Sequence, residues 1–568
     1  MMAQELTFLK AEEVFQRIAR FLEEALRKGL RMDQVERQLK TDLAAAGLAY
    51  LEEFVQASGD GDQGESVAAE GRVLGRSETP QPRRYVSIFG ELWISRYVYT
   101  AGQKKPIEYS PLDAKLGLPA GEISYVLEDF QQRLCVQSPY GKSTKDLKEI
   151  LGTGVAVGTA EHMTQQMGDF AETYRLSALT EEGTPPPEDE AELLVVAADG
   201  KGVVMRKTLA ERLREEKEAA RAGKQADAAT APPPAAGSPQ GSSSDSSPEA
   251  GGRDEEVSGK GPRRTVRKDS RRRGRRGNKR SSRKKTSETS DEKIKRSRKQ
   301  MAYVGAVYTI APFVRTPDQI LDEAARRKRA KDRPRPQNKH VWGEMTKLKE
   351  GELLDGRSKL FLHLAVECQT RDPNHQKPLI CLMDGEEPLW SAKEAWLDRA
   401  VEILDFFHVS EHLWQMGRIH LKGRKLNDFV EHHARMFLEG KVDYAVRNFK
   451  RLIKKWKLRG EPKESMEREI GYFQRNRGRM RYDEYLAKGY PIGSGVAEGT
   501  CRNLVKDRME LTGMRWEQRG AQGMIHLRAL YLNDEWSTFI NYRIEKEQEQ
   551  LYGKDTAYNK VATYAQAL

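Results

Sequence analysis

The sequence predicts an α/β fold in which a mixed β-sheet is combined with helices. Strand-like apolar runs begin near residues 192, 301, 359, 378 and 400, and helix-like segments separate the later runs. Of the 568 residues, 38% are hydrophobic and 8% aromatic, which suits folded domains joined by unfolded stretches. Residues 190–206 and 300–409 are therefore expected to form the core of the protein.

Two modules are expected before this core. Residues 1–57 predict a helical module, because apolar side chains recur there at helical spacing, at Val14, Ile18, Phe21, Leu22, Ala25 and Leu26. Residues 58–80 begin with the Gly- and Asp-rich stretch "SGDGDQGES" and are interpreted as a linker.

Residues 81–185 predict a β-hairpin followed by a helix-turn-helix. The stretch "RRYVSIFGELWISRYVY" alternates around a Gly, and "KSTKDLKEILGTGVAVGTAEHMTQQM" contains a capped helix, a Gly-rich turn and a second helix. A DNA-binding module and an ordinary packed pair of helices are equally good interpretations. The second helix is polar but not basic, with Thr159, His162, Thr164, Gln165 and Gln166.

Three carboxylates stand at the ends of elements in the core. Asp199 and Asp384 each follow an apolar run and precede a Gly, a pattern for which a turn is the default interpretation. Two such Asp residues in one sheet, with Glu498 at the start of a late helix within residues 490–535, favour a site instead. Clustered anions repel one another and raise each other's pKa. Oxygen-only ligands suit Mg²⁺ or Mn²⁺, and the pattern predicts two such ions.

Residues 207–299 predict a disordered insertion, rich first in Ala, Pro and Ser and then in Arg and Lys. Residues 263–285 hold 14 Arg or Lys and one Asp, a local charge of +13, so the rest of the chain sums to −1 (12 minus 13). This block is expected to bind DNA phosphates without reading bases, and a solubilising run is the alternative. Its densest part contains Arg271, Arg272, Arg273, Arg275 and Arg276.

Residues 410–489 predict a helical insertion, and residues 536–568 are interpreted as a C-terminal tail. Four basic residues of the helical insertion either follow a DNA backbone or belong to a solvated helix face: Arg418, Lys422, Arg424 and Lys425.

The chain resembles the bacterial insertion-sequence transposases of the Asp-Asp-Glu class, and within them the ISKra group. The resemblance rests on "ADGKGVVMR", "LMDGEEPLW", "ILDFFHVSEHLW" and "YPIGSGVAEGTCRNLVKDRMELTGMRW", and it covers most of the chain from Phe89 to Trp536. The last motif is the most specific. The basic insertion after Lys207 departs from the pattern, and the paired cysteines of some relatives are missing, so no zinc site is expected.

The resemblance implies a ribonuclease-H-like core with Asp199 on the first strand, Asp384 after the fourth and Glu498 on the helix after the fifth. It implies hydrolysis that frees a 3′-OH at the element's end, followed by strand transfer into target DNA. DNA and further copies of the chain are the implied partners. Phosphates beside Glu498 are expected to contact four basic residues: Arg502, Lys506, Arg508 and Arg515. Asp405 and His408 are expected to support the site, and Trp516 either stacks on an unpaired base or belongs to the core.

Two other functions are compatible with parts of the sequence. His408, Glu411 and His412 match the His-x-x-Glu-His signature of zinc peptidases, but His408 directly follows a strand-like run, whereas such ligands project from one continuous helix. A DNA-binding protein of the same fold that has lost activity is the second alternative. The four cysteines are far apart and suit a reducing cytoplasm, and no membrane span or signal segment is predicted.

Overall fold

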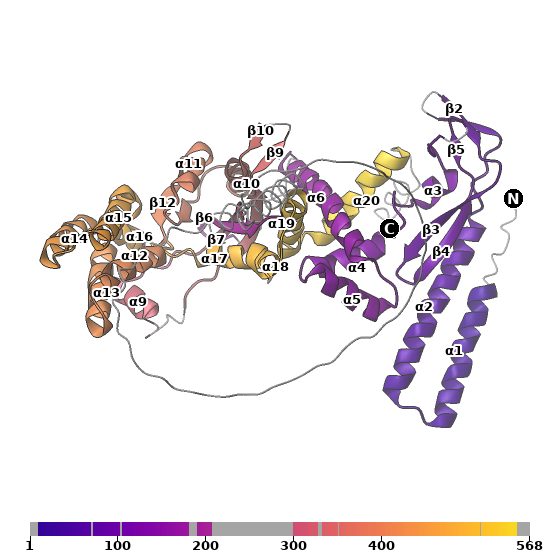
Figure 1. Ribbon diagram of the computed structural model, residues 1–568, viewed down its shortest axis with the longest axis horizontal. Helices are drawn as coiled ribbons and strands as arrows, with labels where there is room; N and C mark the ends of the chain where they lie inside the picture. The colour runs from indigo at the N-terminus through magenta and orange to yellow at the C-terminus, as the bar shows by residue number, and fades with distance from the viewer. Residues whose placement is uncertain are drawn as a thin grey trace, which may run out of the picture. The chain divides into compact units, whose positions relative to one another are not determined.

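The computed structural model describes residues 9–69, 72–102, 105–180, 190–206, 299–325, 327, 332–349, 352–511 and 513–553 (Figure 1). The chain divides into two units, residues 207–298 and the remainder. The predictions for the basic insertion, including Arg271 to Arg276, therefore lie outside the described residues. No helix in the described part is long and apolar enough to cross a membrane.

The N-terminal helical module is a hairpin of α1 (Leu9–Lys28) and α2 (Met32–Ala57). Ala11, Ile18 and Ala25 of α1 are buried at a spacing of seven residues, which is the pattern of a seam between two helices. Gly29 has a φ of 61°, and this left-handed conformation allows the tight connection.

The linker prediction was wrong in part, because residues 58–80 contain two strands. β1 (Ser66–Ala69), β2 (Arg72–Arg76) and β5 (Tyr99–Thr100) form an antiparallel sheet that buries Leu74. The predicted hairpin is confirmed as β3 (Gln81–Ser87) and β4 (Gly90–Arg96).

The predicted pair of helices is confirmed as α5 (Tyr140–Leu151) and α6 (Val157–Thr180), preceded by α3 (Pro111–Leu116) and α4 (Tyr125–Cys135). α6 packs closely on α19 (Gln518–Leu532): a Cβ on Gly168 would lie 2.4 Å from the Cα of Gly523. The tail prediction was wrong for residues 536–552. They form α20 (Trp536–Tyr552), which packs on α6 and buries Trp536 and Phe539 in the core.

The core is a five-stranded mixed sheet with the order β12-β11-β6-β7-β8. Its strands are β6 (Leu193–Val204), β7 (Lys299–Ile310), β8 (Gln337–Met345), β11 (Leu379–Met383) and β12 (Val401–Leu404). β7 runs antiparallel to both β6 and β8, whereas β11 runs parallel to both β6 and β12. The sheet strands thus lie within the predicted core, except that β7 begins one residue before residue 300.

The structure excludes the default turn interpretation of Asp199, and one expectation about a strand was wrong. Asp199 is not in a turn, because β6 continues through it and Asp199 pairs with Val304 of β7. The run near 359 is not a strand: it belongs to α10 (Gly356–Arg371), where Leu360, Leu364 and Cys368 are buried at a spacing of four residues. Asp355 caps this helix, and β8 is the strand that the sequence interpretation missed.

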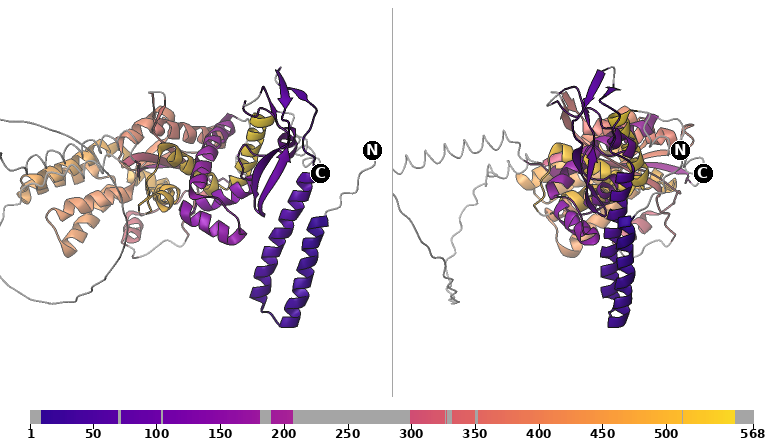
Figure 2. Two further views of the ribbon diagram at one scale, coloured as in Figure 1. Left: turned by 45° about the vertical axis from the view of Figure 1, so that its right-hand side comes forward. Right: turned by 90° about the vertical axis from the view of Figure 1, so that its right-hand side faces the viewer.

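Helices cover both faces of the sheet (Figures 1 and 2). α10 and α11 (Glu387–Trp396) pack on one face, on the side of Leu194 and Val196. The opposite face, on the side of Val195 and Ala197, contacts the helical insertion, which is confirmed as helical. The insertion consists of α12 (Phe406–Arg418), α13 (Gly423–Leu438), α14 (Val442–Lys455), α15 (Glu461–Arg475) and α16 (Tyr482–Ala487).

The remaining described elements are α9 (Pro317–Ala324), β9 (Lys347–Lys349), β10 (Glu352–Leu354), η1 (Arg477–Arg479), α17 (Gly495–Thr500), η2 (Cys501–Lys506) and α18 (Asp507–Met509).

Candidate active site

Asp199 and Asp384 lie side by side on neighbouring parallel strands. The paired register of β6 and β11 ends at Ala198 and Met383; Asp199 is the next residue of β6, and Asp384 directly follows the end of β11. Neighbouring strands are about 4.8 Å apart, so the two carboxylates start from adjacent positions in the middle of the sheet, at the C-terminal end of β11.

Both aspartates point to the same face of the sheet. Side chains alternate along a strand, so Asp199 shares the face of Val195 and Ala197, and Asp384 shares the face of Leu382. This is the face on which α17, which carries Glu498, contacts β6 and β7. The three predicted carboxylates therefore lie on the same side of the sheet.

The segment that presents Glu498 is shaped by glycine and by an irregular helix. A Cβ on Gly493 would lie 2.6 Å from the ring of Phe407, so a larger residue at this position would require the Phe407 side chain to move. α17 continues directly into the π-helical turn η2, and such turns are frequent at functional sites.

Asp405 forms hydrogen bonds with three segments of the site. Its backbone N–H donates to the carbonyl of Met383 (2.9 Å), and its Oδ1 accepts from the N–H of Phe407 (2.7 Å), which caps α12. Its Oδ2 accepts from the N–H of Ser494 (3.0 Å) and from the Ser494 hydroxyl. One buried carboxylate thus joins the end of β11, the start of α12 and the turn before α17. This geometry fits the supporting role expected for Asp405.

The site is strongly anionic. Burial raises the pKa of Asp384 above its ordinary value, and the charges of Asp199 and Asp405 raise it further, against a hydrogen bond from the Glu386 N–H. Partial burial also raises the pKa of Glu498, as do the charges of Asp405, Glu411 and Asp199.

Glu386 is an acidic group of the site that the sequence interpretation missed. Burial raises its pKa, and so do the charges of Asp384 and Asp199. The signal was present in "LMDGEEPLW", where Glu386 follows Asp384 by two residues. Cys501, one turn after Glu498, is also next to Asp199: burial and the charge of Asp199 raise the pKa of its thiol.

Among the described residues, no Lys or Arg forms an ion pair with Asp199, Asp384, Glu386 or Glu498. In the same part of the chain, no three His, Cys, Asp or Glu side chains stand close enough to hold a metal ion as they are. The negative charge of the cluster is thus not offset by a direct ion pair with Lys or Arg among the described residues, although the charge of Arg357 lowers the pKa of Glu386.

The structure changes the argument about the zinc-peptidase motif. His408 and His412 do lie on one continuous helix, α12, so the objection based on a preceding strand was wrong. The side chains of the motif are nevertheless not arranged as a set of zinc ligands. The Nδ1 of His412 is 2.5 Å from Glu469, its ring stacks on Tyr472, and the Glu411 side chain is 72% exposed. The Nδ1 of His408 is 3.9 Å from Glu411, and a charge on His408 lowers the pKa of both Asp384 and Glu498.

The basic residues after Glu498 divide into two groups. Arg502, Lys506 and Arg515 are exposed, and Arg502 is 3.5 Å from Asp507. The prediction that Arg508 contacts DNA was wrong, because Arg508 is 0% exposed and its Nε donates to the Cys135 carbonyl. Trp516 is also buried, and its indole N–H donates to the Met509 carbonyl, so the core interpretation of Trp516 is confirmed and base stacking is excluded.

A larger basic surface lies on α14, and the sequence interpretation missed it. Val442, Ala445, Val446 and Phe449 bury one side of this helix. The other side is exposed and basic, with Arg447, Lys450, Arg451, Lys454 and Lys455. None of these five forms an ion pair with a described residue. The helical spacing of apolar and basic residues in "VDYAVRNFKRLIKK" was the signal. The predicted residues Arg418, Lys422, Arg424 and Lys425 are exposed as well.

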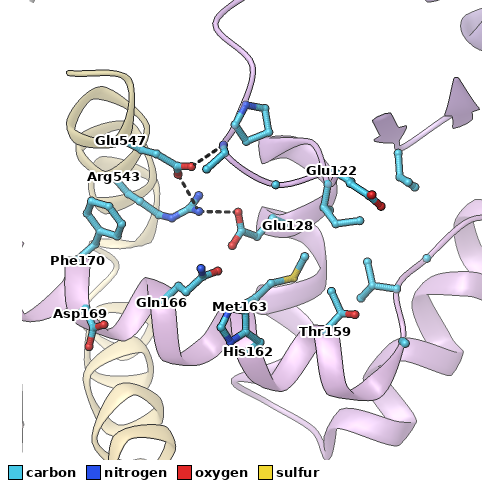
Figure 3. A pocket seen from close by; sticks show the side chains of 18 of the residues that line it. Glu122, Glu128, Thr159, His162, Met163, Gln166, Asp169, Phe170, Arg543 and Glu547 are labelled. Atoms are coloured by element: carbon cyan, nitrogen blue, oxygen red, sulfur yellow. Dashed lines mark hydrogen bonds and ion pairs between the residues drawn. The ribbon is translucent and has the colours of Figure 1, made fainter. Parts of the chain in front are cut away.

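The second helix of the predicted helix-turn-helix does not present all its polar residues outward. Thr164 is buried and its hydroxyl donates to Gln132, whereas Thr159, His162 and Gln166 line a cavity of about 590 Å³ (Figure 3). The wall opposite holds Arg543, which lies between Glu128 and Glu547 and pairs with both (Figure 3). Burial raises the pKa of Glu128 to about 7. An α6 packed in this way favours the interpretation as a packed helical pair.

A scan of the chain against models of protein families and a search of curated proteins found no match.

Proposed function

We propose that this chain is a DNA transposase of the Asp-Asp-Glu class with a ribonuclease-H-like catalytic core. One observation carries the proposal: Asp199 and Asp384 follow paired positions on adjacent parallel strands, on the sheet face that α17 contacts with Glu498. Burial raises the pKa of Asp384 and of Glu498, the charge of Asp199 raises both further, and a buried cluster of this kind costs stability unless it serves a cation.

The order of the elements supports the same proposal. In chain order, β6 is the first strand of the sheet, β11 the fourth and β12 the fifth. Asp199 lies on the first, Asp384 directly after the fourth, and Glu498 on a helix after the fifth. This is the arrangement that the resemblance to insertion-sequence transposases implies.

The three carboxylates fit divalent metal ions that prefer oxygen ligands. Asp199, Asp384 and Glu498 supply oxygen donors, and their charge is not offset by an ion pair with a described basic residue. Bound there, Mg²⁺ or Mn²⁺ would polarise the scissile phosphate and stabilise the leaving oxygen. The chain contributes the three carboxylates, the anchoring of their segments by Asp405, and exposed Arg502 and Lys506 for DNA phosphates.

The proposed reaction has two displacements at this site. In the first, water attacks phosphorus at the element's end, the bond from phosphorus to the 3′ oxygen breaks, and a 3′-OH is released. In the second, that 3′-OH attacks phosphorus of target DNA, and the target's own 3′ oxygen leaves. A covalent bond to the protein is required in neither displacement.

The direct test is strand cleavage of DNA taken from the flanks of the coding region, searched first for inverted repeats. With Mg²⁺ or Mn²⁺, the protein should nick at the repeat and leave a 3′-OH. Binding without cleavage under either metal would favour the inactive DNA-binding alternative. Absence of both binding and cleavage would contradict the proposal.

A further inference from the structure

The α1–α2 hairpin carries large apolar side chains that no described element covers. On α1, Phe15 is 56% and Leu26 is 84% exposed, and on α2, Met32 is 79% exposed, with Leu43 and Phe54 exposed as well. Figures 1 and 2 show α1 beside α2, with no other element drawn as ribbon against it. A cluster of exposed apolar side chains of this size is typical of an interaction surface.

Their spacing indicates what kind of partner the surface fits. α1 has two apolar seams. The first contains Ala11, Ile18 and Ala25 and packs on α2. The second contains Phe15, Ala19, Leu22 and Leu26, with steps of four, three and four residues, which is the pattern of a coiled-coil seam. A helix in an isolated hairpin needs one seam, so the second seam points to a further helix.

Apolar residues of α2 continue the same surface. Met32, Leu39 and Leu43 are spaced by seven and four residues, and Phe54 follows eleven residues after Leu43, which is again helix-packing spacing. In both helices, the exposed apolar residues lie to one side of the residues through which α1 and α2 pack on each other. Because the helices are antiparallel, the two stripes come out on the same side of the hairpin.

We propose that a second copy of this chain covers this surface, so that two hairpins form an antiparallel four-helix bundle. The spacing of the second seam of α1 is the same when the helix is read in either direction. When two α1 helices run antiparallel, Phe15 faces Leu26 of the second copy and Ala19 faces Leu22, and each of these pairings occurs twice. An interface of this isologous kind requires a self-complementary surface.

The charges agree with a second copy and not with a nucleic acid. Residues 9–57 contain eight Lys or Arg and nine Asp or Glu, a net charge of −1. A surface that binds DNA phosphates needs an excess of positive charge. In the antiparallel arrangement, Glu12 at one end of α1 comes close to Arg27 at the other end in the second copy. Neither side chain forms an ion pair with a described residue of its own chain.

The experiment measures the mass of the full chain in solution by light scattering after gel filtration, without DNA and with a chelator. The wild type should have twice the mass of one chain, which is 64.6 kDa. The double variant Phe15→Glu/Leu26→Glu should have the mass of one chain, with unchanged helix content by circular dichroism. The matched control is Val73→Glu, because Val73 on β2 is 74% exposed but lies outside the hairpin, and it should stay dimeric.

A charge exchange tests the antiparallel geometry. Glu12→Arg should weaken dimerisation roughly fivefold, because two symmetry-related ion pairs are removed, and Glu12→Arg/Arg27→Glu should restore it. A monomeric wild type would overturn the proposal and would indicate that another segment of the same chain covers the surface. A dimer that persists in Phe15→Glu/Leu26→Glu, or that is absent in Val73→Glu, would also overturn it. The assay contains no DNA or metal, so its outcome is independent of strand cleavage.

Discussion

Asp199 directly follows Ala198 of β6, and Asp384 directly follows Met383 of β11; because Ala198 and Met383 are paired, the two aspartates occupy adjacent positions. Two carboxylates in adjacent positions repel each other, and burial strengthens the effect by excluding water. Burial is the largest cause of the raised pKa of Asp384, and the charge of Asp199 raises it further. Neither aspartate forms an ion pair with a described Lys or Arg, which is why a cation is proposed to bind between them.

Addition of Mg²⁺ should therefore stabilise the protein. At a metal concentration one hundred times the Kd, the free energy of unfolding should rise by about 2.7 kcal/mol, which differential scanning fluorimetry detects as a higher Tm. Asp384→Asn should remove most of this shift and should itself raise the Tm in chelator, because it relieves repulsion. Glu78→Gln, at an exposed carboxylate with no interaction in the described part, should behave as the wild type. An unchanged Mg²⁺ response in Asp384→Asn would exclude Asp384 as a ligand.

The pH dependence of this shift has a defined sign. Protons compete with the metal, and Asp384 and Glu498 bind protons more tightly than their ordinary pKa values of 3.8 and 4.5 allow. The Mg²⁺-induced shift should thus begin to shrink above pH 4.5 as the pH falls. In metal-free protein, these two groups contribute stability below their ordinary pKa, and that contribution is lost as the pH rises through the raised values. A Mg²⁺ shift that is constant down to pH 4.5 would contradict this account.

The basic face of α14 should bind DNA backbone. Lys450→Glu/Lys454→Glu should weaken binding of specific and unrelated duplexes equally, because interactions with phosphates carry no sequence information. The slope of log K against log salt should fall by about 0.9 for each phosphate that the variant no longer neutralises. Lys105→Glu, at an exposed lysine outside α14, is the control for a general charge effect. An unchanged salt slope in the α14 variant would show that this face does not touch DNA.

Residues 207–298 should be removable without loss of the fold. Val204 of β6 pairs with Lys299 of β7, so the two ends of this segment leave adjacent positions of one hairpin. A short Gly/Ser connection should restore the hairpin, since each doubling of loop length changes stability by only about 0.6 kcal/mol. DNA affinity and its salt dependence should both fall, because residues 263–285 carry 14 Lys or Arg. Titrations at several salt concentrations decide this, and loss of binding to specific DNA alone would indicate base reading.

Asp405 should matter for both stability and cleavage. Asp405→Ala removes the cap of α12 and the acceptor for Ser494, at a cost of about 2 kcal/mol in thermal unfolding. Because Ser494 precedes Glu498, cleavage per folded molecule should fall as well. Asp355→Ala is the matched control: Asp355 caps α10 in the same way but does not bond the turn before Glu498. Equal loss of cleavage in both variants would show that Asp405 only stabilises the fold and does not position Glu498.

Local sequence patterns did not determine the secondary structure around the predicted carboxylates. Asp199 followed by Gly is typical of a turn, yet β7 pairs along the whole of β6 and keeps Asp199 in a strand. Residues 359–367 are apolar enough for a buried strand, and only their burial on one helix face distinguishes α10. Tertiary packing decides both cases, and local propensity does not contain it.

Single basic or aromatic residues were the least predictable part of the site. Arg508 and Trp516 lie in a basic segment that was expected to face DNA, but both are enclosed by α4 to α6 and α19, which are distant in sequence. The opposite error occurred at α14, whose basic face is plain from helical spacing once the helix is known to be a surface helix.

The most direct test of the account is single-turnover cleavage of element-end DNA with Mg²⁺ by three variants, Asp199→Asn, Asp384→Asn and Glu498→Gln. Each substitution replaces a charged carboxylate with a neutral amide and leaves the exposed basic residues in place. Cleavage should fall by more than about 100-fold in each, since loss of a group that only supports a metal ligand already costs up to that much. DNA binding should remain close to the wild-type level. Near-wild-type cleavage by any one variant would remove that residue from the site, and near-wild-type cleavage by all three would refute the carboxylate site itself.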